Sequence, residues 1–335
     1  LVLTALIAQE HPLLVGPPGT GKSMLLDALL RWTGGNSSFN ILMNKFTQPE
    51  EVFGPVDVTG LKQGVYRRIT TGRMPEAEFA FVDEVFKGSS AILNTMLRIL
   101  NERMFENGDG VFREVPLLLC VAASNEWPDG KELGALFDRF LFRKKVSYIR
   151  SKAGRERLLF GAAEHSPKFS TTVTNQEIQL AHETAKKLPW EQKAMTAMLD
   201  LISDLNKDGI CPGDRRIYKS RNAVRAYAYL NGADTVRVEH LAVLAHTLWE
   251  DPAEQPERVA KAVAKIANPV GSRINELLLA AEDVVDKSQP VEAVPKLKDI
   301  RKQLQNLPAD PRKDKAERLI EQMVKEAYDR VIQTA

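Results

Sequence analysis

Short apolar runs alternate with stretches of helical periodicity over residues 1–150. The runs read PLLVG at 12–16, SFNILM at 38–43, FAFVDE at 79–84 and VPLLLCVAAS at 115–124. Consecutive apolar positions are typical of strands that helices cover on both faces. The alternation therefore predicts an α/β fold with a parallel sheet between helical layers. Glycine or polar residues follow or end each run, so we expect the functional groups at the strand ends.

Two stretches interrupt this alternation. Residues 52–78 carry turn glycines around alternating apolar and polar positions, which predicts a β-hairpin. Residues 103–115 contain an Asn-Gly and an Asp-Gly pair between two β-prone flanks, which also predicts a hairpin. We expect both to project from the sheet.

Amphipathic helical stretches replace the strand pattern from residue 151 onwards. A proline- and charge-rich joint at 250–259 leads to further helices, and the last of them has apolar residues at helical spacing between Leu319 and Val324. We predict that this stripe packs against other helices, and pairing with another protein is the alternative. The pattern indicates three parts, which are a core (1–150), a helical second domain (151–250) and a helical C-terminal extension (251–335).

Composition narrows the classes of protein only slightly. The chain is 44% hydrophobic and 27% charged, as globular proteins are, and its net charge of +2 indicates no global attraction to nucleic acid or anionic membranes. Cys120 and Cys211 lie far apart without neighbouring ligands, which favours a reducing cytoplasmic location over a zinc site or disulfide framework. The chain opens on Leu1, and we expect an N-terminal segment of a longer protein to be missing.

Residues 16–23 have the pattern of a phosphate-binding loop between a strand and a helix. Glycines would let backbone N–H groups point at phosphate oxygens, and the helix start adds its positive dipole end. Lys22 would reach the β- and γ-phosphates, and the Ser23 hydroxyl would bind Mg²⁺. A glycine turn that only caps a helix is the alternative. The loop consists of Gly16, Pro17, Pro18, Gly19, Thr20, Gly21, Lys22 and Ser23.

Polar side chains end the later strands. Asp83 fits a group that orders the hydration shell of the Mg²⁺ ion that Ser23 would bind. Glu84 fits the base that orients the attacking water. Asn125 could hydrogen-bond both the γ-phosphate and that water. An ordinary solvated strand end and a turn asparagine are the alternatives.

Three arginines follow. Arg139, at the end of a predicted helix, fits either a paired structural arginine or an arginine finger that reaches a neighbouring subunit's γ-phosphate. Arg215 and Arg216 open another helix, where the dipole disfavours cations, so we expect an anion beside them. That anion is either the bound phosphates, approached from the second domain, or nearby carboxylates.

These motifs, together with FTQPEEVFGPVDVTGLK at 46–62 and AILNTMLRILNERMF at 91–105, resemble AAA+ ATPases of the MoxR family, especially its RavA branch. The resemblance covers residues 12–235. It implies that Lys22 and Ser23 are Walker A residues, Asp83 and Glu84 Walker B, Asn125 sensor 1, Arg139 the arginine finger and Arg215 sensor 2, with Arg216 as its rival.

The resemblance also implies an AAA+ αβα core, an all-helical lid and a C-terminal helical extension. Residues 52–78 would be the helix-2 insert, and the hairpin around 107–110 the pre-sensor-1 insert. Family members form hexameric rings that use ATP, ADP and Mg²⁺ and act on protein clients in a chaperone-like way, commonly with a von Willebrand factor A domain partner. The segment that helps such motors hold adenine is largely missing before the first strand.

Two alternatives remain from the sequence. One is a nucleic-acid-acting AAA+ motor or transcription activator, although only Lys62, Arg67, Arg68 and Arg73 give the first insert positive charge. The other is a scaffold that binds ATP and hardly hydrolyses it until a partner arrives.

Overall fold

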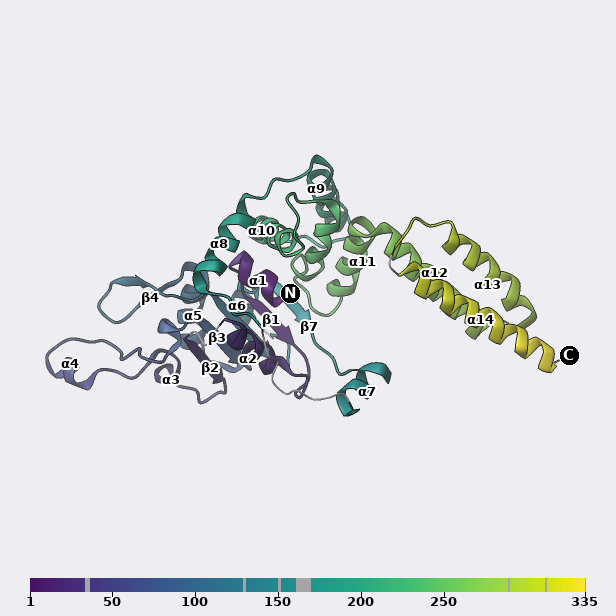
Figure 1. The fold of residues 1–335 in the computed structure, drawn as a ribbon. Helices are drawn as coiled ribbons and strands as arrows, with labels where there is room; N and C mark the ends of the chain where they lie inside the picture. The colour runs from purple at the N-terminus through teal and green to yellow at the C-terminus, as the bar shows by residue number, and fades with distance from the viewer. Residues whose placement is uncertain are drawn as a thin grey trace. The chain divides into compact units, whose positions relative to one another are not determined.

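The computed structural model describes residues 1–33, 37–128, 131–149, 152–160, 170–288, 290–310 and 312–334, and Figure 1 shows their fold. The chain forms two compact units. The first comprises residues 1–191, 212–236 and 246–253, and the second comprises residues 192–211, 237–245 and 254–335.

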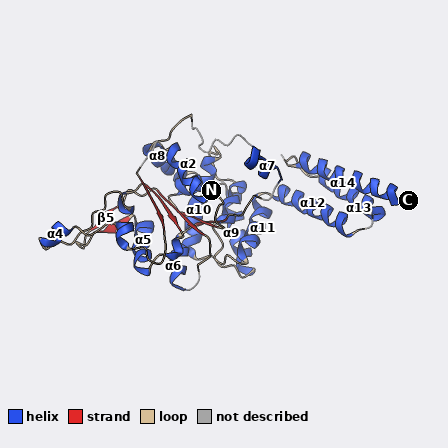
Figure 2. Cartoon of the chain, turned by 90° about the horizontal axis from the view of Figure 1, so that it is seen from below, coloured by secondary structure: helices blue, strands red, loops and turns tan. Residues whose placement is uncertain are grey.

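A five-stranded parallel sheet forms the centre of the first unit. Its order is β2-β3-β6-β1-β7. Every residue of β1 and β6 is buried, and because successive side chains point to opposite faces, both faces of the sheet are covered. Figure 2 shows the strands in red between blue helices. The predicted sheet is therefore confirmed. The strands are β1 (Pro12–Val15), β2 (Ser38–Leu42), β3 (Phe79–Asp83), β6 (Leu119–Ser124) and β7 (Phe142–Lys145).

The edge strand β7 is missing from the strands that the hydrophobic pattern predicts. It reads FRKK, and its second half is exposed, so it lacks the apolar run that marks the other strands. Its register is nevertheless fixed by pairing with β1, from Pro12 opposite Phe142 to Val15 opposite Lys145. An edge strand with basic residues is a common means of discouraging further strand pairing.

Helices surround this sheet. Three of them, α1, α8 and α10, pack against one another. Helix α8 begins with a capping box in which Thr174 and Glu177 satisfy each other's backbone N–H groups. The helices of the first unit are α1 (Val2–Ala8), α2 (Lys22–Trp32), α3 (Pro49–Phe53), α4 (Val58–Lys62), α5 (Ser90–Glu102), α6 (Lys131–Arg139), α7 (Lys152–Phe160), α8 (Asn175–Lys187) and α10 (Asp214–Leu230), with 3₁₀ turns η1 (Met74–Glu76) and η2 (Val85–Lys87).

The first insert is not the hairpin that its glycines predict. Asp57 accepts hydrogen bonds from the backbone N–H groups of Thr59 and Gly60, and this cap starts the short helix α4. A single antiparallel bridge, between Val56 and Arg68, closes the loop below the helix. Side-chain capping thus outweighs the strand pattern over these residues.

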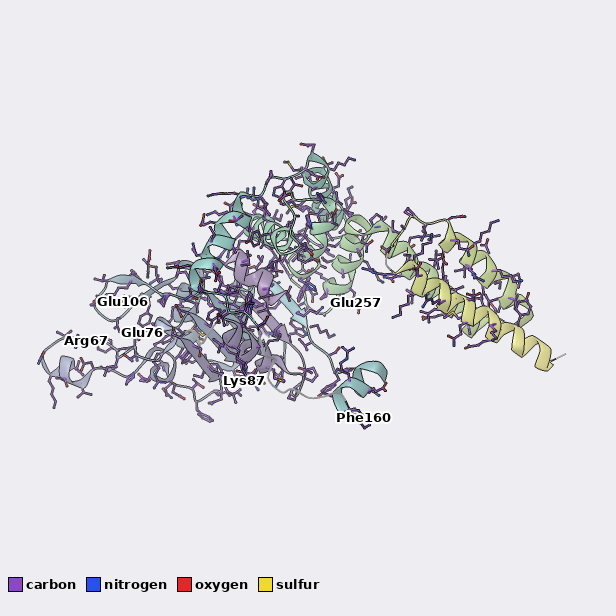
Figure 3. The ribbon with its side chains drawn as sticks, in the orientation of Figure 1. Arg67, Glu76, Lys87, Glu106, Phe160 and Glu257 are labelled. Atoms are coloured by element: carbon purple, nitrogen blue, oxygen red, sulfur yellow. The ribbon has the colours of Figure 1, made fainter. Side chains whose placement is uncertain are left out.

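The second insert is the predicted hairpin. Strands β4 (Met104–Glu106) and β5 (Phe112–Glu114) pair antiparallel. Its loop is tied to the first insert, because the Asn107 side chain accepts from the backbone N–H of Arg68 at 2.8 Å and donates to the Arg68 carbonyl at 3.1 Å. Figure 3 shows both inserts projecting side by side, with Arg67 on one and Glu106 on the other.

The second unit is helical. Its helices are α9 (Gln192–Lys207), α11 (Gln255–Ala267), α12 (Pro269–Lys287), α13 (Pro290–Gln305) and α14 (Lys313–Thr334). The 3₁₀ helix η3 (Val238–His246) contributes residues to both units. No helix among the described residues is long and apolar enough to cross a membrane.

The last three helices enclose a core of their own. Most of the C-terminal stripe predicted to pack between helices does so, since Ile320 and Val324 of α14 lie in this core and Met323 packs against it, whereas Leu319 is exposed. The core consists of Ile274, Leu277, Ala281, Ala293, Val294, Leu297, Ile300, Leu304, Ala316, Ile320, Val324 and Ala327.

The core of α12, α13 and α14 predicts a specific response to cavity formation. Leu297→Ala removes a fully buried side chain and should destabilise these helices by about 2–5 kcal/mol. Leu279→Ala, on the exposed side of α12, should change their stability by less than about 0.5 kcal/mol. Native-state hydrogen exchange of peptides from 269–334 measures both. Equal protection in the two variants would contradict this packing.

Candidate active site

The loop between β1 and α2 has a backbone that requires glycine. Gly19 and Gly21 have φ angles of 75° and 78°, which L side chains rarely adopt. A Cβ on Gly16 would lie 2.1 Å from the carbonyl oxygen of Val146. The loop can therefore run close to the neighbouring backbone and turn directly into α2, whose first N–H groups lack intrahelical partners. These features are those of an anion-binding loop.

Lys22 lies folded over this loop. Its ammonium group donates to the carbonyl oxygens of Gly16 and Pro17 at 2.8 and 3.0 Å, and to Oδ1 of Asn125 at 3.2 Å. None of these three acceptors is a carboxylate, so they satisfy the hydrogen atoms without neutralising the charge. Thr20 fixes the loop from within, because its hydroxyl donates to the Pro17 carbonyl at 2.9 Å.

Glu84 follows β3 in a strained conformation. Its φ angle is 52°, in the left-handed region, and its side chain is buried. For a residue with a long side chain this conformation costs on the order of 1–3 kcal/mol. One carboxylate oxygen, Oε1, accepts a hydrogen bond from Nδ2 of Asn125, and the other, Oε2, lies 3.3 Å from Nζ of Lys87. Such strain is typical of functional positions.

Asn125 connects the loop to the carboxylate. Because β6 lies between β1 and β3 in the sheet, the residue that follows β6 lies between the ends of the other two strands. Its amide accepts from Lys22 and donates to Glu84. Asp83, the last residue of β3, accepts from the Glu84 N–H at 3.0 Å. Ser23 lies exposed in the first turn of α2, and Pro18 is exposed in the loop.

Arg139 ends α6, far along the chain from this group. Its Nη1 lies 3.9 Å from Oδ2 of Asp138, and its Nε is buried without a hydrogen-bond acceptor among the described residues. A contact of 3.9 Å with a half-exposed carboxylate is weak. Arg139 is therefore partly buried, with its side chain 28% exposed, and it has no close carboxylate partner among the described residues.

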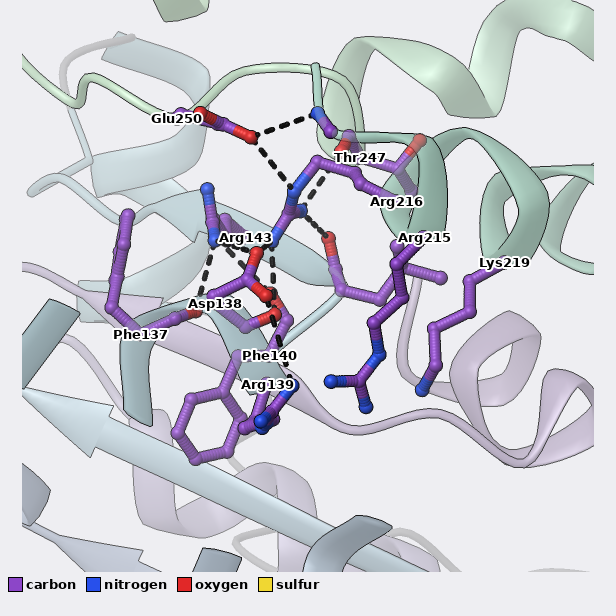
Figure 4. A network of polar contacts seen from close by, with 12 residues as sticks. Phe137, Asp138, Arg139, Phe140, Arg143, Arg215, Arg216, Lys219, Thr247 and Glu250 are labelled. Carbon is purple, nitrogen blue, oxygen red and sulfur yellow. Dashed lines mark hydrogen bonds and ion pairs between the residues drawn. The ribbon is translucent and has the colours of Figure 1, made fainter. Parts of the chain in front are cut away.

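Arg216 is a structural residue. Its guanidinium donates to the carbonyl oxygens of Leu141, Thr247 and Asp138 at 2.9–3.1 Å, and to Oδ1 of Asp138 at 3.0 Å (Figure 4). Its Nε also lies 3.9 Å from Glu250. Carbonyl groups and carboxylates of its own chain therefore supply the anion that this helix start requires.

Arg215 differs from its neighbour. It is exposed, and its Nη2 donates to Oδ1 of Asn101, near the end of α5, at 2.6 Å. The Asn101 amide in turn donates to the Leu97 carbonyl at 2.7 Å, which fixes its orientation. Of the two rival arginines, only Arg215 is accessible to a ligand.

Arg143, on β7, is a buried arginine that the sequence pattern misses. It donates to the carbonyl oxygens of Phe140, Phe137 and Trp249, and its guanidinium lies 3.7 Å from the centre of the Phe137 ring. Burial, and then the charge of Arg216, lower its pKa. The aromatic residues on its N-terminal side are the one signal that could have indicated a buried, stacked guanidinium.

Five of the candidate side chains fall into two groups. Lys22, Glu84 and Asn125 meet at the carboxyl ends of the parallel strands. Arg139 and Arg215 lie at the amino ends of the strands. Helix α6 runs back along the sheet before β7 begins, and Arg139 is its last residue. Helix α5 likewise runs back before β6, and Arg215 contacts Asn101 near its end. The structure therefore does not place Arg215 beside the phosphate loop of its own chain.

The two neighbouring arginines should respond differently to truncation. Arg216→Ala leaves buried carbonyl groups unsatisfied and should destabilise the first unit by about 2–4 kcal/mol. Arg215→Ala, on the surface, should change stability by less than about 0.5 kcal/mol. All four tryptophans belong to the first unit, so urea unfolding followed by tryptophan fluorescence reports its stability. Equal midpoints would contradict the structural role of Arg216.

Two proteins from other organisms resemble this chain in sequence. The uncharacterised protein MJ0079 of Methanocaldococcus jannaschii is 36% identical over 332 residues, which cover 99% of this chain and 82% of that protein. The chaperone MoxR1 of Mycobacterium tuberculosis is 27% identical over 168 residues, which cover 46% of this chain and 41% of that protein.

The likeness extends to a solved structure. A crystal structure of a proposed ATPase from Cytophaga hutchinsonii superposes with a TM-score of 0.62 over 79% of this chain and 87% of that chain, at 15% identity. At this identity the likeness concerns the fold alone, and it confirms the predicted AAA+ αβα core followed by a helical part.

Family models match both the sheet-containing region and the helices after it. A model of the MoxR domain in the MoxR-vWA-beta-propeller ternary systems matches residues 1–188, which is more than half of the chain. A model of an AAA lid domain matches residues 193–263. With the phosphate loop, Glu84 and Asn125 assembled at one end of an αβα core, the chain belongs to the MoxR family of AAA+ ATPases.

Proposed function

We propose that this protein hydrolyses ATP to ADP and phosphate. The observation that supports the proposal most strongly is the direct contact of Asn125 with both Lys22 and Glu84 at the phosphate-binding loop. The Asn125 amide thereby lies within hydrogen-bond reach of a cation suited to phosphates, Lys22, and of a carboxylate suited to water, Glu84.

The loop residues fit a nucleoside triphosphate and Mg²⁺. The close approach of Gly16 to Val146 and the positive φ angles of Gly19 and Gly21 leave backbone N–H groups for phosphate oxygens. Lys22, whose present acceptors leave its charge unbalanced, would bind the β- and γ-phosphates. Ser23 and Asp83 would hold Mg²⁺, Asp83 through water. When bound, the ion neutralises charge on the phosphate oxygens.

The remaining side chains act on water and on the developing charge. Glu84 would accept the proton of the attacking water and orient it, while Asn125 would hold water and γ-phosphate together. Arg139 and Arg215 lie at the opposite ends of the strands from their own loop. We assign both to the phosphates of a neighbouring subunit, where Arg139 is the arginine finger and Arg215 takes the role of sensor 2.

Sites shared in this way require a head-to-tail ring. We propose a hexamer, as the sequence resemblance implies. The family model describes systems that combine a MoxR domain with a vWA and a beta-propeller component. MoxR1 of M. tuberculosis is a chaperone by name. These descriptions support a chaperone-like role in remodelling or maturing protein complexes with a von Willebrand factor A domain partner. The RavA-like branch and the cytoplasmic location stay predictions from the sequence.

The alternative of a nucleic-acid motor gains no support from the first insert. Arg67 is paired with Asp57 at 2.8 Å, and Arg68 donates to the Gly54 carbonyl and to Glu50. Arg73 donates to the carbonyl oxygen of Glu51. These three guanidinium groups stabilise the loop itself. Salt-dependent binding of DNA by the purified protein would revive the alternative.

Removing the base tests the hydrolytic role. Glu84→Gln keeps the shape of the side chain and its contact with Asn125, but it cannot accept a proton, so the steady-state rate should fall by about 10²–10⁴-fold with nucleotide binding retained. Glu126→Gln, an exposed glutamate beyond the same end of the sheet, should keep the wild-type rate. Phosphate release and binding of a fluorescent ATP analogue measure the two properties. Unchanged hydrolysis in Glu84→Gln would refute the assignment.

Mixed rings test the shared site. Glu84→Gln and Arg139→Ala should each be inactive alone, but co-expression combines an intact loop and base from one subunit with an intact arginine from the next. About a quarter of the sites in a random 1:1 ring would be complete. Hydrolysis should therefore reappear.

The matched control pairs Glu84→Gln with Lys22→Ala. Both changes affect the same side of the shared site, so no combination of these subunits yields a complete site and no activity should return. Equal failure of both mixtures, at confirmed co-assembly, would show that Arg139 does not act across an interface.

A further inference from the structure

Lys87 neutralises the carboxylate that the proposed mechanism needs as a base. It ends η2, the 3₁₀ turn that starts directly after Glu84. Its Nζ lies 3.3 Å from Oε2 of Glu84. Oε1 of Glu84 accepts a hydrogen bond from Asn125, whereas Oε2 is buried and has only this ion-pair contact, without a hydrogen-bond donor among the described residues.

The two contacts of Glu84 differ in how nucleotide would affect them. Asn125 also accepts from Lys22, so a phosphate that drew Lys22 away would change the hydrogen bonding of this amide. Lys87, in contrast to Asn125, forms no hydrogen bond with Lys22 among the described residues. It sits on the turn after Glu84, with its side chain 42% exposed, and would keep its contact with Oε2 when the loop is filled.

The turn that carries Lys87 also contacts the helix that carries the arginine finger. Phe86 of η2 packs against Phe137 of α6, with ring centroids 6.4 Å apart. Phe137 lies two residues before Arg139 and is stacked by the buried Arg143. A displacement of α6 when Arg139 engages a neighbouring subunit would therefore act directly on the turn beside Glu84.

We propose that Lys87 is a positioning residue that restrains Glu84 in the resting subunit, and that engagement of α6 by the neighbouring subunit relieves this restraint. The inference rests on the proposed function, because it concerns the same base. An attacking water that uses Oε2 of Glu84 shares this oxygen with the Lys87 ammonium group, and the contact with Lys87 is the one that nucleotide alone leaves in place.

Removal of the charge should speed hydrolysis. Lys87→Gln should raise kcat for ATP in the absence of any partner by about two- to five-fold, since a half-exposed ion pair is worth little. KM for ATP should stay unchanged, because Lys87 does not touch the loop. Lys87→Arg, which keeps the charge, should retain the wild-type rate. Lys45→Gln, an exposed lysine just beyond β2 at the same end of the sheet, is the matched control and should also match wild type.

The outcomes separate this inference from the proposed function. If the wild-type protein hydrolyses ATP and Glu84→Gln does not, while Lys87→Gln is slower than or equal to wild type, the restraint is refuted. If Glu84→Gln is as active as wild type, the proposed function fails first. A loss of folding would lower kcat and the urea concentration at the midpoint of unfolding, as measured by tryptophan fluorescence. A raised kcat at an unchanged midpoint therefore supports the restraint and is not explained by a change in stability.

Discussion

Parallel pairing of the strands is the constraint on which the other features depend. Because all five strands run in one direction, their carboxyl ends share one edge of the sheet, where the loop after β1, Glu84 after β3 and Asn125 after β6 meet. Each connection must return to the opposite edge before the next strand begins. The same geometry therefore places the C-terminal ends of α5 and α6 away from the phosphate-binding loop. Arg215, which contacts the end of α5, and Arg139, which ends α6, lie there too.

Local patterns predicted the buried strands and the phosphate loop because each carries its own signal. Apolar runs marked β1, β2, β3 and β6, whereas β7 carries three basic residues among its four positions and is defined by its partner strand. The first insert contradicted its glycine pattern because one carboxylate, Asp57, caps a helix there. A carboxylate can cap a helix only where the folded loop brings it close to unpaired backbone N–H groups. The alternation of apolar and polar residues does not show where this happens.

The roles of neighbouring charged residues were the least accessible to sequence reasoning. Arg215 and Arg216 are adjacent and chemically identical, yet one is exposed and the other fully committed to backbone carbonyls. Helical periodicity shows that adjacent residues point in different directions, but it does not show which direction is buried. Arg143 was hidden for a similar reason. Its acceptor at Trp249 lies 106 residues away in the sequence, and only the folded chain brings the two together.

The two hydrogen bonds between Asn107 and the backbone of Arg68 join loops that lie 39 residues apart in the sequence. A Cβ on Gly108 would also collide with the ring of Tyr66, 2.2 Å away. The two inserts are therefore held together as one structural unit. A side chain added at position 108 would therefore displace Tyr66 and deform both loops, although the substitution lies in only one of them.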